Sequence, residues 1–247
     1  MNKNGEKVNK VQLLENDRCL VDFQRGNLAA PMTFDDCLTA DRNDKVQKAR
    51  EKTAEREGLK CDPLDEAPPF AYTDSSTVNQ SAVNRALALT YAIFGGPPVL
   101  DAALVKRAEN KETAKCQFEL LKRADRLESV LLNEIGKAKR KAVRDQTVDS
   151  QAALEAKLRV ILSSNRRINR VQDQLVTLVD LRCAELQVTP DTIFPGECGE
   201  GGPELSEIED CVITAARCGA CSMINAFDDL NLDCDRVDDQ TANGSCP

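Results

Sequence analysis

The chain has 247 residues, of which 41% are hydrophobic and 4% aromatic, and its formal net charge is −8. This charge argues against a general role on nucleic acid, whose affinity comes mostly from Lys and Arg side chains that neutralise phosphates. The absence of histidine excludes Ser–His and Cys–His catalytic pairs, and no apolar run approaches the roughly 18 residues of a membrane-spanning helix.

Residues 1–110 form the first of three predicted regions, a series of helices separated by turns. Gly26 should end the first helix and Gly95 the third, and Ser75 or Ser76 is the expected N-cap of the third. We predict these helices at about 3–24, from 39 or 41 to 58, at 75–94 and at 99–108. The second has a thin apolar stripe and should lie on the surface, whereas the third should be the most buried.

Residues 111–190 form the second predicted region, a long antiparallel helical hairpin. Apolar residues recur every three or four positions from Cys116 to Ala142, and again from Leu154 to Val179. The short polar connection between these segments predicts two antiparallel helices, each about 50 Å long. Asn165 and Gln172 interrupt the second stripe, either as polar residues that fix register or as part of a polar patch for a partner.

Residues 191–247 form the third predicted region, an acidic, cysteine-rich cap. A Pro- and Gly-containing loop precedes it, followed by the segment "SEIEDCVITAARCGACSMINAF", which predicts a helix. Ser206 and Glu209 have the spacing of a capping box. Cys218 and Cys221 form a C-x-x-C motif inside this helix, whereas a thiol–disulfide oxidoreductase places such a motif at a helix N-terminus after a buried strand.

The chain contains eleven cysteines, and six lie in the last 50 residues. This density predicts disulfides and therefore an oxidising compartment: the periplasm, the cell surface or the extracellular space. The start has no apolar stretch typical of a signal peptide, so we expect an export signal upstream; the alternative is a cytosolic protein with free thiols. The disulfide candidates are Cys19, Cys37, Cys61, Cys116, Cys183, Cys198, Cys211, Cys218, Cys221, Cys234 and Cys246.

Two pairing expectations follow from the predicted helices. Cys116 and Cys183 lie at the ends of the hairpin that meet, so a bridge between them is geometrically reasonable; pairing outward to Cys61 or Cys198 is the alternative. The tail cysteines Cys234 and Cys246 should be tied back to the helix that carries Cys211, Cys218 and Cys221. The odd number of cysteines implies a lost partner, or one free or intermolecular thiol.

The tail also contains candidate metal ligands. A four-cysteine zinc site usually needs two C-x-x-C-like knuckles, and the tail offers one. Asp233, Asp235 and Asp239 supply hard oxygen ligands, but the segment lacks the glycine and glutamate positions of an EF-hand. We therefore expect a solvated acidic loop and no cofactor, with a weak, irregular Ca²⁺ site at these three aspartates as the alternative.

Charge is unevenly distributed along the chain. Residues 106–145 contain 12 basic and 7 acidic side chains, whereas residues 191–247 contain 2 basic and 13 acidic ones. This opposition could dock the cap on the hairpin or let copies of the chain meet head to tail, since surface charge steers association. Two solvated faces are the simplest alternative.

Two stretches carry a family resemblance. They are "PPFAYTDSSTVNQSAVNRALALTYAIFG" and "CVITAARCGACSMINAFDDLNLDCDRVDDQTANGSC", together with the Lys115-Cys116-Gln117 helix start. The chain resembles a group of uncharacterised cysteine-rich exported proteins of delta-proteobacteria and related environmental bacteria. The resemblance implies export, and with it disulfides, but carries no function and no site residues.

The sequence thus predicts an all-α, disulfide-stapled protein: a long antiparallel helical hairpin, shorter helices and a small cysteine-rich C-terminal cap. We expect a non-enzymatic structural or interaction protein whose partner is a protein, including copies of itself, with no nucleic acid and no membrane span. The alternatives are a metal- or small-ligand-binding module that uses the acidic tail, and a thiol–disulfide oxidoreductase at C-G-A-C.

Overall fold

The computed structural model describes residues 2–61, 72–148, 150–186, 188–202 and 204–246. Within these residues the protein is all-α, with no strand, as predicted. No described helix is both long and apolar enough to cross a membrane. The elements are α1 (Asn2–Arg25), α2 (Phe34–Thr39), α3 (Lys45–Lys60), α4 (Ser75–Phe94), α5 (Val99–Ala103), α6 (Lys111–Arg144), α7 (Gln151–Ser164), α8 (Arg166–Cys183), α9 (Pro190–Ile193), the 3₁₀ turn η1 (Glu197–Gly199), α10 (Leu205–Asp228) and α11 (Cys234–Asp238).

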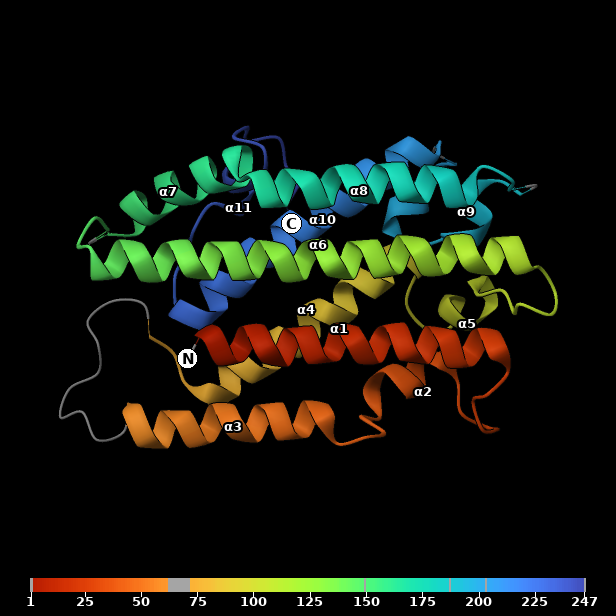
Figure 1. The fold of residues 1–247 in the computed structure, drawn as a ribbon, viewed down its shortest axis with the longest axis horizontal. Helices are drawn as coiled ribbons and strands as arrows, with labels where there is room; N and C mark the ends of the chain where they lie inside the picture. Colours follow the sequence, from red (N-terminus) through yellow and green to blue (C-terminus); the bar gives the residue numbers. More distant parts are fainter. Residues whose placement is uncertain (1, 62–71, 149, 187, 203, 247) are drawn as a thin grey trace.

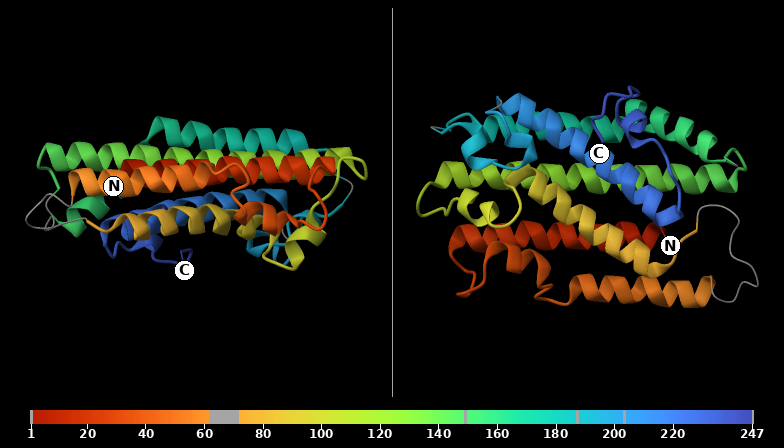
Figure 2. Two further views of the ribbon diagram at one scale, coloured as in Figure 1. Left: turned by 90° about the horizontal axis from the view of Figure 1, so that it is seen from below. Right: turned by 180° about the vertical axis from the view of Figure 1, so that it is seen from behind.

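The helices pack in two layers. In one layer, α3, α1, α6 and α8 lie side by side in that order (Figure 1). In the other, α4 and α10 cross this layer obliquely from behind (Figure 2). One hydrophobic core includes buried side chains from both layers, such as Val8, Leu127, Phe94 and Phe227, and extends through all three predicted regions.

The hairpin of α6 and α8 is the longest feature of the fold and was predicted from its apolar stripe. The stripe residues of α6 are buried from Cys116 to Ala142, except for the half-buried Ala138. The 34 residues of α6 span about 51 Å. Asn110 begins the helix by accepting a hydrogen bond from the Thr113 N–H at 3.1 Å.

The second arm of the hairpin is not the single helix that we predicted. It breaks at Asn165, which ends α7 and begins α8 in an extended conformation with a ψ of 112°. The Asn165 side chain accepts hydrogen bonds from the Arg167 and Ile168 N–H groups at 2.9 and 3.2 Å. Because asparagine competes well as an N-cap, a polar residue in the stripe starts a new helix here, and α7 turns away toward α11 (Figure 1).

Four other predicted helix ends differ in the structure, and capping groups account for three of these differences. α3 starts at Lys45 rather than at 39 or 41, since the Asp41 carboxylate accepts the N–H groups of residues 45–47. Asp74 rather than Ser75 or Ser76 caps α4, and α10 starts after Glu204, which forms a capping box with Glu207. The predicted helix at 99–108 ends at residue 103.

Five disulfides staple the fold. Cys116 and Cys183 are bonded across the open end of the hairpin, so the direct bridge is confirmed and outward pairing is not observed. Cys61 is the one free thiol among the eleven cysteines. The bridges are Cys19–Cys37, Cys116–Cys183, Cys198–Cys211, Cys218–Cys246 and Cys221–Cys234. Because such bridges persist in oxidising environments, they indicate a protein that works outside the cytoplasm.

A buried ion pair fixes the two layers to each other at one end. Lys139 of α6 pairs with Asp228 at the end of α10, and Asn2 Nδ2 donates a hydrogen bond to the same carboxylate at 2.9 Å. Burial lowers the pKa of Lys139 and raises that of Asp228, while the attraction between the two charges opposes both shifts. The pair thus joins α6, α10 and the start of α1.

Candidate functional site

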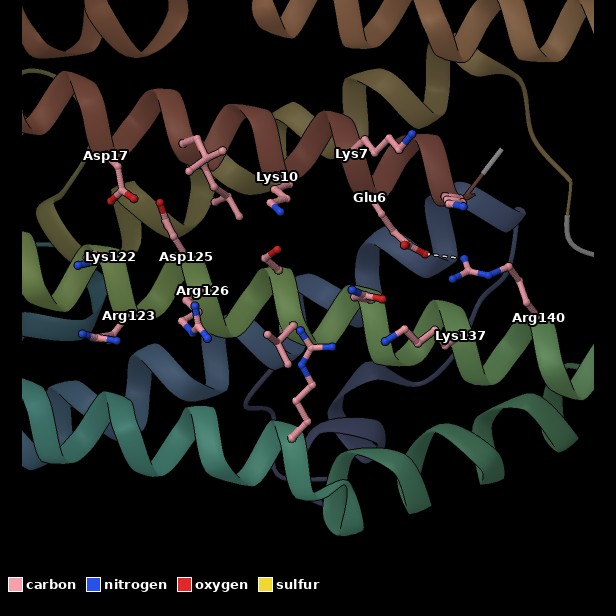
Figure 3. Close-up of a pocket in the computed structure, with 17 residues that line it drawn as sticks. Glu6, Lys7, Lys10, Asp17, Lys122, Arg123, Asp125, Arg126, Lys137 and Arg140 are labelled. Carbon is pink, nitrogen blue, oxygen red and sulfur yellow. Dashed lines mark hydrogen bonds and ion pairs between the residues drawn. The ribbon is translucent and has the colours of Figure 1, made fainter.

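A groove of about 630 Å³ lies along α1 and α6 (Figure 3). The two helices are antiparallel: Gln24 Nε2 donates to the Ala114 carbonyl at 2.6 Å near one end, and Arg140 Nη1 donates to Glu6 Oε1 at 2.9 Å near the other. Arg167 of α8 adds a side chain to the rim. The groove therefore runs along the helices rather than across them.

Basic side chains dominate the groove. Four of them already have partners: Arg123 pairs with Glu119, Arg140 with Glu6, and both Lys137 and Arg167 with Glu134. The nine basic residues are Lys3, Lys7, Lys10, Lys122, Arg123, Arg126, Lys137, Arg140 and Arg167. The other five, which we call the unpaired cations, are Lys3, Lys7, Lys10, Lys122 and Arg126. They form no ion pair or hydrogen bond with the part of the chain that the structure describes; Lys122 lies 5.6 Å from the Phe118 ring.

Helical spacing places the unpaired cations in one row on each helix; Lys10 extends toward α6, whereas Lys7 lies on the side of α1 away from it (Figure 3). Lys3, Lys7 and Lys10 are four and three residues apart on α1, and Lys122 and Arg126 are four apart on α6. The distribution of charge along the sequence showed the basic excess of residues 106–145. The row on α1 was not predicted, although the spacing of its three lysines by four and three residues could have revealed it.

Two carboxyl groups face each other at one end of this basic groove. Asp17 extends from α1 and Asp125 from α6 toward each other (Figure 3). Asp125 is only 4% exposed, and neither of its side-chain oxygens has a hydrogen-bond partner among the described residues; Asp17 Oδ1 has none either. We call Asp17 and Asp125 the carboxyl pair.

Burial changes the protonation of the carboxyl pair. It raises the pKa of Asp17 to about 6; the Lys122 charge opposes this shift and the Glu119 charge adds to it. Burial, followed by the charges of Asp17 and Glu128, raises the pKa of Asp125 well above its usual range. Burial therefore favours the protonated form of both carboxyl groups, and a protonated carboxyl group can both donate and accept hydrogen bonds.

Glu128, one turn beyond Asp125, is buried between the layers and makes stability depend on pH. Burial raises its pKa to about 7, although Asn9 Nδ2 donates a hydrogen bond to it at 2.7 Å and the Arg85 charge also lowers the value. Since the folded-state pKa exceeds the ordinary 4.5, the stabilisation is complete below pH 4.5 and lost as pH rises through about 7.

We therefore expect the free energy of unfolding in urea to fall between pH 5 and 8, and Glu128→Gln to reduce this fall. Glutamine keeps an oxygen that accepts from Asn9 but does not titrate. The exposed Glu51→Gln, on α3, is the control. A pH dependence unchanged by Glu128→Gln would show that Glu128 is not the group responsible.

The cysteines predicted in the tail are brought together, but as cross-links. Cys218 and Cys221 lie in the interior of α10 and bond to Cys246 and Cys234, not to each other. Among the described residues, only Cys218, Asp238 and Cys246 form a group with metal-ligand spacing. Two of these three are the halves of one disulfide, which leaves no thiolate for zinc.

The three candidate calcium ligands do not gather around one point. Asp233 accepts from the Arg236 N–H at 3.3 Å and begins α11. Asp235 accepts from the Ser245 N–H and Asp239 from the Thr241 N–H, each at 2.7 Å. These carboxylates thus hold the turns of the tail, and hydrogen bonds led by the one from the Gly244 backbone lower the pKa of Asp235.

Comparison with known proteins returned no similarity: no family model matches the chain, and neither a curated protein nor a solved structure matches it significantly.

Proposed function

We propose that this chain is a non-catalytic binding protein of the extracellular space, cell surface or periplasm, and that the groove between α1 and α6 holds an anionic partner. The observation that carries this proposal is that the groove is lined by a row of unpaired cations on each of its two helices. A carboxylate or phosphate between such rows accepts charge-assisted hydrogen bonds, which are about twice as strong as neutral ones.

Repulsion among the unpaired cations destabilises the free protein, and this supports a binding role. Lys3 and Lys7, and likewise Lys122 and Arg126, are like charges four residues apart, a spacing that destabilises a helix by a few tenths of a kcal/mol per pair. Elsewhere on α6, Lys137 has Glu134 three residues before it and pairs with it. The unpaired cations thus weaken the free protein, and a bound anion relieves that repulsion.

The shape of the groove favours an extended partner. From Lys3 to Asp17 the α1 side of the groove covers 14 residue steps, or about 21 Å. No described lining residue is aromatic, so the groove offers no ring on which nucleobases could stack. A short acidic segment of a protein fits these features better than a nucleic acid.

Titration calorimetry with an N-acetylated six-residue polyglutamate peptide tests the proposal. We expect Lys7→Glu with Lys10→Glu to weaken binding at least about tenfold, because each reversal removes an attraction and adds a repulsion. Lys48→Glu with Lys52→Glu is the matched control, since it changes the net charge equally on exposed positions of α3. Equal weakening by both variants, or no binding by the unaltered protein, would overturn the proposal.

Self-assembly is a second candidate function, favoured by the separation of charge between the layers. The basic groove lies on α1 and α6, whereas exposed acidic residues such as Glu207 and Asp210 lie on α10 in the other layer (Figure 2). Copies stacked groove to cap would form an open, head-to-tail chain. Sedimentation that depends on concentration and is abolished by Lys7→Glu with Lys10→Glu would support it, and a monomer at high concentration would contradict it.

A further inference from the structure

The carboxyl pair is at odds with a groove built only for anions. Two acidic groups in a basic groove reduce its attraction for a polyanion. Burying a polar group without a partner also costs free energy, and Asp125 is nine-tenths buried or more with both oxygens unsatisfied. The fold therefore retains two groups that neither its own packing nor anion binding explains.

The neighbouring cations do not neutralise the pair. Arg123 is within reach of the same surface but bonds Glu119 at 2.6 Å. The positive charge of Lys122 lowers the pKa of Asp17. Lys122 nevertheless forms no ion pair with Asp17 or Asp125 among the described contacts. Three oxygens of the carboxyl pair are therefore left without a donor from the described chain.

A metal ion is a poor occupant of this end of the groove. Ca²⁺ takes six to eight oxygen ligands, and the pair belongs to no group of three or more potential ligands among the described residues. An incoming ion would also meet the unpaired cations without an anion of its own. An organic cation needs only acceptors, and an ammonium group brings three N–H donors, equal to the three unsatisfied oxygens of the pair.

We propose that the groove captures the free amino terminus of an acidic peptide segment, with the ammonium group on Asp17 and Asp125 and the acidic side chains on the unpaired cations. This inference rests on the proposed function and names its partner. Capture of a terminal amine together with its chain is a known mode of peptide recognition.

The rest of the lining suits a peptide rather than a phosphate chain or a sulfated sugar. Ser129 and Asn133 offer a hydroxyl and an amide to backbone groups, and Leu14 is 46% exposed beside them in the groove. An extended peptide of six residues is about 20 Å long, which matches the α1 side of the groove. Inorganic polyanions carry no cation that would satisfy the carboxyl pair.

The test compares the six-residue polyglutamate peptide with a free amino terminus and its N-acetylated form, by calorimetry at pH 6.5. We expect the full protein to bind the free-amine peptide at least about tenfold more tightly. Asp17→Asn with Asp125→Asn should reduce this ratio to about one while still binding both. If the double variant does not fold, the single variant Asp17→Asn, at a half-buried position, is used for the same comparison.

Proton release on binding provides a second measurement of the contact between the peptide amine and the carboxyl pair. An ammonium group on the pair favours its ionised form, so the free-amine peptide should release a proton that the acetylated peptide does not. Heats measured in two buffers of different ionisation enthalpy report this difference. Equal affinities for the two peptides would overturn this inference but leave the anion-binding groove, and so would a preference for the free amine that persists in the double variant. If neither peptide binds, both proposals are overturned.

Discussion

Replacing Cys116 and Cys183 together by alanine is expected to lower the free energy of unfolding by about 4 kcal/mol. The bridge closes a loop of 67 residues, and it limits the freedom of the unfolded chain more than any other bridge in the fold because the entropy lost on closure grows with loop length. Both positions are buried, so alanine avoids placing a new polar group in the core. Urea denaturation under non-reducing conditions measures the loss.

The control for this experiment is the bridge between Cys198 and Cys211, which are 13 residues apart. The same chain-entropy argument gives about 3 kcal/mol for its removal. The two variants should therefore differ by roughly 1 kcal/mol, with the hairpin bridge the more costly to lose. A hairpin bridge that costs clearly less than the short one would contradict the view that it staples the fold.

Replacing Asp228 by alanine is expected to cost about 3–5 kcal/mol, because it leaves the Lys139 ammonium buried without its partner. The same change removes the acceptor for Asn2 and so loosens the start of α1. Removing both charges, with Lys139→Met added to Asp228→Ala, should recover most of the loss, since no buried charge then remains.

A double-mutant cycle in urea measures this coupling. The single variants Asp228→Ala and Lys139→Met and their combination are compared with the unaltered protein. Losses that simply add in the combined variant would show that the two side chains do not interact, and that the layers are held together by apolar packing alone at this end.

The sequence predicted the parts of the fold that depend on regular apolar spacing. The stripe from Cys116 to Ala142 identified α6, and the polar turn after it implied the return of the chain and the bridge to Cys183. It could not separate two meanings of Asn165, because an asparagine in a stripe is either a tolerated polar contact or a cap. Only the backbone conformation at that residue decides between them.

The packing of the buried face of α1 could not be predicted from the sequence, for a different reason. Its buried residues include several amides, which do not form an apolar stripe. Asn9 Nδ2 donates to the Ala82 carbonyl, and Asn16 Nδ2 to the Ala86 carbonyl, each at 3.1 Å. Periodicity in apolar residues cannot reveal a face that packs through amide hydrogen bonds, so neither the partner of α1 nor the groove beside it was predicted.

The candidate site was missed for the same reason. Lys7, Lys10, Asp17 and Asp125 are common residue types at ordinary helical spacing, and nothing in the sequence distinguishes a buried aspartate from a solvated one. These residues line one groove only because α1 packs antiparallel to α6. The cysteine-rich tail, in contrast, attracts attention in the sequence, but the structure uses its thiols as cross-links.

Mapping the bound peptide on the protein by NMR tests the central claim most directly. The free-amine polyglutamate peptide is added to ¹⁵N-labelled protein, and backbone amide shifts are followed to saturation. We predict that the largest changes lie on the groove faces of α1 and α6, around Lys7, Lys10, Asp17 and Arg126, with α3 unaffected. Changes centred on α3 or on the acidic tail, or no saturable change, would contradict the assignment of this groove as the binding site.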